Sequence, residues 1–342
     1  LFLRICCDTL QLEDQAILTN RLGGVTAVFK LYTEAVVKRV TKQIGVVPQR
    51  RLVERAIKAL AQEMADTGRE EVASSRAYDI VSEFFPSTNP VGQDLLFQLQ
   101  NEGLLTAQPA YEDDAEEEYR FTFQRMSDHA IASSLLSRSV IAGDTTTAFA
   151  ADTPLRRAVM DLYSPITPGL LEALAVQLPE RFGVELTDMP DLPDPWVVSE
   201  AFEESLLNRS NKSFNERTWT LIEEVGSARL RFETMIALST DPDRDHNAEF
   251  LDKELRALPM PQRDAVWSTH LADPSKRAER LIDWIHEADQ DAIRPERAAL
   301  AGLQLCWFLT TSARTVRDTA TKALVVLLAS RPELASALGY WL

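Results

Sequence analysis

The chain has 342 residues, 45% of them hydrophobic, and its 36 Lys and Arg against 52 Asp and Glu give a net charge of −16. The apolar content excludes a wholly disordered chain, and the length suits about two domains or one elongated helical array. The negative charge disfavours a general nucleic-acid binder, because nucleic-acid phosphates attract clustered Lys and Arg.

The N-terminal part of the chain carries helical periodicity broken by turn residues. The chain begins with Leu1 inside an apolar stretch, and we expect both of its ends to be cuts through a longer protein. Further on, apolar residues recur at helical spacing, and Gly45, Gly68, Pro86 and Gly103 mark where the helices end. The predicted helices span residues 26–43, 49–66, 74–84 and 94–102.

A change of period then predicts a β-hairpin. Leu104–Ala107 and Tyr119–Phe123 are short and rich in apolar or strand-forming residues. Between them, Glu112–Glu118 holds six carboxylates in seven residues, which predicts a solvated loop. A helix resumes at Ser127. Helices followed by a hairpin with a long tip are typical of a winged helix, so we expect a winged-helix domain over residues 26–140.

From about residue 150 to residue 342 the pattern is helical throughout, with Pro at many of the boundaries. Helices with short connections predict an α-solenoid of the HEAT or TPR type, although the letters hold no strict repeat. The predicted fold class is therefore mainly α, a winged-helix domain followed by a helical-repeat array. The predicted helices of the array span residues 153–163, 168–178, 196–208, 215–225, 228–239, 248–258, 261–271, 276–288, 295–310 and 313–328.

The sequence lacks the motifs of the common catalytic sites. It holds no phosphate loop, no nucleophile elbow and no zinc-binding pattern, so we expect no catalytic residue, no metal site and no cofactor held by this chain alone. Asp241–Asp252 begins like a calcium loop, but His246 stands where the turn needs Gly, and Asp252 where a bidentate Glu is usual. We interpret this segment as a turn between helices.

The other reactive or aromatic side chains favour structural roles. Cys306 lies in an apolar helix, and three cysteines, two of them adjacent, fit a reducing and therefore cytoplasmic compartment. No uncharged apolar run is long enough to span a membrane. The histidines show no catalytic spacing, and we expect the tryptophans to be buried anchors. These residues are His129, His246, His270 and His286, and Trp196, Trp219, Trp267, Trp284, Trp307 and Trp341.

A winged helix also suggests DNA binding. Here the wing tip would carry six carboxylates, which the DNA phosphates would repel. Arg50, Arg51 and Arg55 form one small basic patch, too little to reverse that repulsion. A structural winged helix is therefore preferred, and nucleic acid is disfavoured as a partner of this segment.

Four stretches resemble STAND ATPases of the NACHT type. Leu1–Cys6 resembles the helix that follows their nucleotide-binding core, and Tyr119–Ser133, YRFTFQRMSDHAIAS, looks like the end of their winged-helix domain. Met260–Ser268, MPQRDAVWS, and Arg317–Leu324, RDTATKAL, resemble stretches of the bacterial antiviral STAND proteins, the Avs group. By this resemblance the chain covers the winged-helix region and the start of the helical-repeat sensor.

The resemblance implies a multidomain defence protein, in which sensor binding and ATP drive oligomerisation that activates an N-terminal effector. Residues 1–25 would end the helical segment that follows the ATPase core. The implied partners are that ATPase domain, upstream in the same protein, a phage protein as trigger, and further copies of the protein when it is active. ATP or ADP with Mg²⁺ would bind the parent protein through motifs outside this chain.

The resemblance also implies a nucleotide contact within the chain. In NACHT proteins a winged-helix His often contacts bound ADP, and the matching position here is Phe123 or Gln124, depending on register. Phe123 cannot replace that His, whereas Gln124 can donate a hydrogen bond to a phosphate oxygen and Arg125 can supply charge. Gln124 and Arg125 are thus the residues expected to bind the nucleotide phosphate.

Two other functions remain open on the sequence. One is a transcription regulator with a winged helix and a helical ligand-sensing domain, and the other is a helical-repeat interaction scaffold without a switch. A phosphate-loop motif upstream in the same reading frame would favour the STAND ATPase. A start Met near Leu1 together with a palindromic promoter site would favour the regulator.

Overall fold

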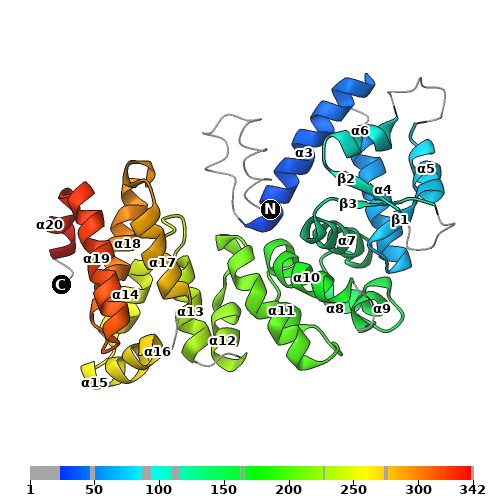
Figure 1. The fold of residues 1–342 in the computed structure, drawn as a ribbon. Helices are drawn as coiled ribbons and strands as arrows, with labels where there is room; N and C mark the ends of the chain where they lie inside the picture. Colours follow the sequence, from blue (N-terminus) through cyan, green and yellow to red (C-terminus); the bar gives the residue numbers. More distant parts are fainter. Residues whose placement is uncertain are drawn as a thin grey trace. The chain divides into compact units, whose positions relative to one another are not determined.

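The computed structural model describes residues 24–46, 51–85, 94–109, 116–161, 164, 166–225, 228–272 and 276–339. These residues are mainly helical, with one small antiparallel sheet (Figure 1). The chain divides into two compact units, residues 1–213 and 214–342. The predicted segment 1–25, apart from its last two residues, lies outside the described residues, as do Arg50, Trp341 and the first four residues of the acidic block.

The first unit begins with two helices whose ends obey the expected chemistry. α3 (Val25–Ile44) and α4 (Leu52–Thr67) each stop at a glycine in the left-handed conformation, Gly45 with φ 73° and Gly68 with φ 68°. The backbone N–H of each glycine donates to a carbonyl of the last turn, which satisfies a group that the helix end would otherwise leave open. Both helices were predicted to within a few residues.

The predicted hairpin is present, and a third strand joins it. β2 (Leu105–Gln108) pairs with β3 (Glu118–Phe121), and β3 also pairs with β1 (Glu71–Ala73), so the strand order is β1-β3-β2. β1 was not predicted, because a strand of three residues shows no alternation long enough to recognise. Val72, Tyr119 and Phe121 bury one face of the sheet.

Three more helices adjoin the strands of the sheet. α5 (Ser74–Ser82) follows β1 directly, and α6 (Leu95–Asn101) leads into β2, with the Asp94 side chain accepting from the Leu96 N–H at its start. α7 (Gln124–Ser139) follows β3 and packs against α4. Two predicted boundaries were wrong here: the strand ends at Phe121, not Phe123, and the helix begins at Gln124, three residues before Ser127.

α10 (Thr167–Phe182) is the central helix of the first unit. Its residues from Leu170 to Leu178 are buried almost all round, except Glu172, so it packs on several sides rather than presenting one apolar stripe. It contacts α7, α9 and α11, and it runs through Pro179 to Gly183, a further left-handed cap. The remaining elements are α8 (Thr145–Ala148), α9 (Pro154–Met160), η2 (Leu186–Asp188), α11 (Pro195–Asn208) and η3 (Asn211–Ser213).

The second unit is helical in its described residues and has its own core. α18 (Pro295–Leu309) takes the central place and contacts α14, α17, α19 and α20. The predicted helix over 261–271 is broken by a π-helical turn at Asp264–Ser268, and α20 (Glu333–Gly339) was not predicted. The other helices are α12 (Glu216–Val225), α13 (Ala228–Leu238), α14 (Ala248–Ala257), α15 (Met260–Arg263), α16 (Thr269–Ala272), α17 (Lys276–Glu287), η5 (Gln290–Ala292) and α19 (Arg314–Ser330).

No helix among the described residues combines the length and the apolar character that crossing a bilayer requires.

A fully buried ion pair ties two segments of the first unit together. Arg209, just after α11, places its Nη1 2.8 Å from Glu185 Oε1 and 3.0 Å from Oε2, and both side chains are 0% exposed. Its Nη2 donates to Ser205 Oγ, and its guanidinium lies 5.4 Å from the centre of the Phe202 ring. These contacts compensate the removal of both charges from water, so the loss of one partner leaves the other charge buried alone.

We therefore expect Arg209→Met to lower the free energy of unfolding by about 3–5 kcal/mol. Arg314→Met should change it by less than about 0.5 kcal/mol, because the Arg314–Asp318 pair is 85% and 53% exposed. The double variant Arg209→Met with Glu185→Leu should recover much of the loss. Urea unfolding of the three variants measures this, and equal effects of Arg209→Met and Arg314→Met would contradict it.

Candidate functional site

The two predicted phosphate-binding residues lie at the N-terminal end of α7, and both already hold a carboxylate. The Gln124 Nε2 donates to Glu70 Oε1 at 3.0 Å, and Glu70 precedes β1. The Arg125 Nη2 lies 3.2 Å from Glu172 Oε2 on α10, and the two side chains are 53% and 35% exposed. An incoming phosphate would therefore have to replace a carboxylate at each residue. Phe123, the alternative in the other register, is buried.

A third carboxyl group, that of Asp128, is buried one turn further along α7. It lies against the first turn of α10, where a Cβ added at Gly169 would come 2.4 Å from the Asp128 Cγ. Only glycine leaves room for this close approach. The Asp128 Oδ1 is buried and accepts no hydrogen bond among the described residues. Burial, with smaller contributions from Glu70 and Glu172, raises the pKa of Asp128 from 3.8 to about 7, against the opposing effect of Arg125.

The next residue, His129, belongs to a polar network that links α3, α7 and α10. Its Nδ1 lies 3.5 Å from Thr26 Oγ1 and 3.4 Å from Gln177 Nε2, and the same Gln177 amide donates to the His129 carbonyl at 2.8 Å. The Phe29 ring packs edge-on against the imidazole. Burial lowers the pKa of His129 from 6.5 to about 4, helped by the nearby Arg125 charge, so the ring is neutral at physiological pH.

The same network fixes the start of α3. Gly24 has φ 100°, and an added Cβ would come 2.6 Å from the Ser210 N and 2.8 Å from Glu180 Oε1. Glu180, near the end of α10, accepts from the Ser210 N–H at 2.7 Å. Burial raises the pKa of the Glu180 carboxyl, against the lowering effect of hydrogen bonds from Ser210 and Thr26. The chain thus enters α3 through a close contact with the segment after α11.

The second unit holds a separate polar and aromatic group around Trp307. The Trp307 Nε1 donates to Asp252 Oδ1 at 2.9 Å, and the Trp267 Nε1 donates to the Trp307 carbonyl at 3.0 Å. Arg256 binds both oxygens of Asp252. Trp267 and Trp307 are thus buried anchors as predicted, whereas Trp196 is 70% exposed and contradicts that prediction. Trp196 stands in the first turn of α11 with its side chain at the surface.

The remaining sequence candidates have structural surroundings. Cys306 is buried, and burial raises the pKa of its thiol to about 11, which fits the predicted core position. The segment from Asp241 to His246 is a turn between α13 and α14, in which Asp241 binds Arg244. His246 packs among Phe214, Trp219 and Phe250, and the His270 Nε2 lies 3.4 Å from Glu233 Oε1.

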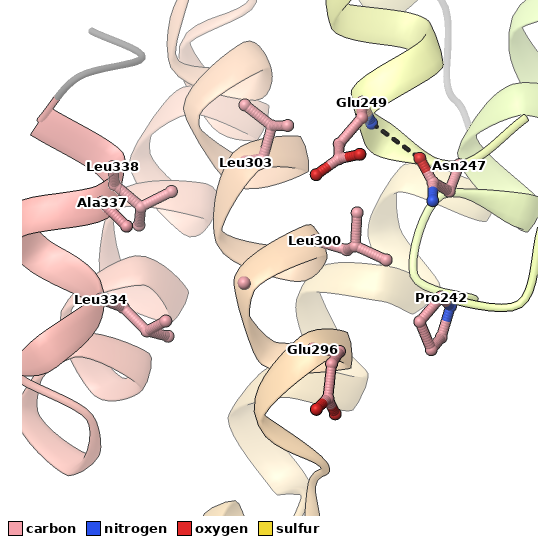
Figure 2. Close-up of a pocket in the computed structure, with 10 residues that line it drawn as sticks. Pro242, Asn247, Glu249, Glu296, Leu300, Leu303, Leu334, Ala337 and Leu338 are labelled. Carbon is pink, nitrogen blue, oxygen red and sulfur yellow. Dashed lines mark hydrogen bonds between the residues drawn. The ribbon is translucent and has the colours of Figure 1, made fainter. Parts of the chain in front are cut away.

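A groove of about 290 Å³ opens in the second unit between α14, α18 and α20 (Figure 2). α18 forms its floor, and the other two helices form its walls. Figure 2 shows the Glu249 carboxylate of α14 facing Leu303 of α18 across the groove. The apolar lining comes mainly from Leu300, Leu303, Leu334, Ala337 and Leu338.

Nowhere in the described residues do three or more His, Cys, Asp or Glu side chains gather as a metal site requires. The comparisons with known proteins find no matching family model, no matching curated protein and no matching solved structure. The resemblance to STAND ATPases therefore depends on the sequence motifs alone.

Sequence reasoning located Gln124 and Arg125 but missed the groups around them. Glu70, Asp128 and Glu172 lie far from one another in the chain or inside an ordinary helix, and no motif marks them. A signal was available in the Asp128-His129 pair between the apolar residues Met126 and Ile131, since a polar pair at core positions needs a partner.

Asp128 and His129 should give the stability opposite dependences on pH. The folded-state pKa of Asp128 is raised, so the folded state binds more protons than the unfolded state between about pH 4 and pH 7, and its contribution falls as pH rises. The folded-state pKa of His129 is lowered, so its contribution rises with pH over about 4 to 6.5.

The free energy of unfolding of Asp128→Asn minus that of wild type should increase as pH rises from 4 to 8, by on the order of 4 kcal/mol, because only wild type loses the proton. The same difference for His129→Gln should decrease as pH rises from 4 to 6.5. Ser127→Ala, at a buried neighbour that does not titrate, should differ from wild type by the same amount at every pH. Denaturant unfolding at several pH values measures the three differences, and parallel curves for all three would contradict the assignment.

Proposed function

We propose that this chain is the winged-helix and sensor portion of a STAND-type ATPase in antiphage defence. In this proposal the winged helix closes over bound ADP in the resting state, and ligand binding by the helical array favours the state that assembles. The observation that carries the proposal is the position of Gln124 and Arg125 at the start of α7, where both side chains reach carboxylates that a phosphate could replace.

The element order supports a winged-helix domain. α4, β1, α5, α6, β2 and β3 follow one another, and the strand order β1-β3-β2 places the last strand between the other two. The acidic block joins β2 to β3 and would form the wing. Its last residues are held rather than free, because Glu116 accepts from the Ser75 N–H and Oγ, and the Ser74 N–H donates to the Glu117 carbonyl.

The pattern of helix contacts supports a helical array after α7. Consecutive helices pack in pairs, as α10 does with α11 and α18 with α19, and helices further apart in the chain also meet, as α13 does with α17 and α14 with α18. Stacked pairs of this kind are what a solenoid builds from. On α10 and α11, burial raises the pKa of Glu172 and of Glu203, and the nearby carboxylates of Glu200 and Glu204 raise both further, while Arg125 opposes the rise at Glu172, so this face suits a basic partner.

The switch then consists of an exchange of anions at α7. In the described conformation, Glu70 and Glu172 hold Gln124 and Arg125. In the nucleotide-bound conformation, phosphate oxygens take the place of these carboxylates. Opening the two contacts takes the Arg125 charge away from Glu172 and Asp128. The two conformations therefore differ in electrostatic energy, and a bound nucleotide selects between them.

The parent protein, with the residues upstream of Leu1, tests this exchange. Gln124→Ala with Arg125→Ala should lower retention of ADP by about tenfold or more, because hydrogen bonds to charged groups contribute about 1.5–3 kcal/mol each. Glu70→Gln with Glu172→Gln should raise it, because the competing carboxylates are gone. Nucleotide released from the purified protein is quantified by chromatography.

Arg157→Ala provides the matched control, since Arg157 is exposed on α9 and makes no ion pair with the residues the structure describes. Unchanged retention in the Gln124 and Arg125 variant would overturn the contact. An upstream reading frame without a phosphate-loop motif would overturn the STAND ATPase itself.

A transcription regulator is the second candidate, and the helix before the hairpin argues against it. In a DNA-binding winged helix this helix enters the major groove, but α6 has the sequence LLFQLQN, with no Lys or Arg, and lies between Asp94 and Glu102. Phe97 on α6 is 50% exposed, which suits a protein contact better than a phosphate backbone.

We accordingly expect no binding to duplex DNA at physiological salt. Replacing the acidic block by a Gly-Ser linker of equal length should not create specific binding, because α6 supplies no cation to read the groove. Fluorescence anisotropy with a labelled genomic duplex measures both proteins. Sequence-specific, salt-dependent binding by the unmodified chain would favour the regulator instead.

A further inference from the structure

The groove between α14, α18 and α20 joins an apolar floor to an acidic rim. Leu300 and Leu303 of α18 and Leu334 and Leu338 of α20 are each less than a tenth exposed, yet all four line the open space of about 290 Å³. Ala337 lies on the α20 side (Figure 2). A space of this size is at the lower limit of small-molecule sites and fits one or two apolar side chains of a partner.

Two exposed carboxylates also line the groove, Glu249 on α14 and Glu296 on α18, and Pro242, Asn247 and Ala299 make up the rest. Neither makes an ion pair with any residue in the described ranges. Of the cations near them in the chain, Arg244 binds Asp241, Arg294 lies 3.8 Å from Asp243, and Arg297 donates to the Thr240 carbonyl at 3.2 Å. Lys253 follows Glu249 by one turn on α14 and makes no ion pair with it. Both carboxylates stand in the first turn of their helices and have no ion-pair partner among the described residues, so the rim can pair with a cation from outside.

We propose that this groove binds a segment of a partner protein that presents one or two large apolar side chains next to Lys or Arg. The apolar side chains fill the groove between α14, α18 and α20, and the basic groups pair with Glu249 and Glu296. The inference rests on the sensing role proposed for the array, and it names the chemistry of the segment that the array would recognise.

The lining disfavours the other classes of ligand. The two carboxylates repel an anion such as a nucleotide or a phosphate. A neutral apolar ligand would fill the floor, but it would partly desolvate Glu249 and Glu296 without giving them a partner, which costs free energy. A segment with a basic group beside an apolar one satisfies both parts of the groove.

A pair of fluorescent peptides tests the proposal on the whole chain. One peptide repeats Leu-Leu-Lys-Lys, and the other repeats Leu-Leu-Glu-Glu with the same length and apolar content. We expect the basic peptide to bind and the acidic one not to bind, by fluorescence anisotropy. Binding of the basic peptide should weaken as salt is raised, because exposed ion pairs are screened.

Variants then place the peptide in the groove. Glu249→Lys with Glu296→Lys should weaken binding by about tenfold, the effect of two exposed ion pairs. Ala337→Phe, which fills the space without changing charge, should weaken it by a similar factor. The control Glu279→Lys with Glu287→Lys makes the same change of charge on exposed residues of α17 outside the groove, and it should bind within about twofold of wild type.

Circular dichroism and thermal unfolding check that each variant keeps the fold. Equal binding of the two peptides, or equal loss in the groove and control variants, would overturn the proposal, because either result means attraction to the surface charge as a whole. Undiminished binding in Ala337→Phe would also overturn it. The assay contains no nucleotide, so its failure is separate from a failure of the ADP-retention experiment.

Discussion

The burial of α10 on nearly all its sides is the constraint on which the first unit depends. A helix buried on most of its sides must satisfy most of the polar groups it carries by contacts within the protein. Gln177 does so by donating to the His129 carbonyl, and Glu180 does so by accepting from the Ser210 N–H. These two side chains join α10 to α7 and to the segment after α11, so the predicted winged-helix region and the first helices of the predicted array form one compact unit. Asp128 of α7, which lies against Gly169 of α10, has a buried Oδ1 that accepts no hydrogen bond among the described residues.

Local chemistry made most helices predictable. Apolar periodicity located α3, α4 and α19, and left-handed glycines ended α3, α4 and α10, since only glycine adopts that conformation at little cost. The errors have physical causes. α10 was predicted to end at Leu178, before Pro179, yet a Pro in the last turn removes one hydrogen bond and the helix runs on to Phe182. β1 exists because β3 pairs with it, a contact between distant segments that three residues do not announce.

The resemblance names two residues of the candidate site but says nothing of the charges around them. The resemblance selected Gln124 and Arg125, but their carboxylate partners come from a turn before β1 and from α10. A sequence shows charge only as a sum along the chain, whereas a pKa depends on distance and burial in space. The raised pKa of Asp128 and the lowered pKa of His129 arise at adjacent residues, because one is a buried acid and the other a buried base.

The acidic residues behind the net charge of −16 have different surroundings in the structure. Some carboxylates are neutralised inside the protein, as Glu185 is by Arg209, and others cap or hold backbone groups, as Glu116 does at Ser75. Glu249 and Glu296 lie in the first turns of α14 and α18, where the helix dipole favours a negative charge, and both line an apolar groove. An exposed carboxylate without an ion-pair partner contributes little to stability, but it adds to the negative electrostatic potential that an approaching partner meets. Carboxylates that are paired inside the protein are not accessible to a partner. The exposed carboxylates beside the groove are, and under our proposal they select a partner segment that is both apolar and basic.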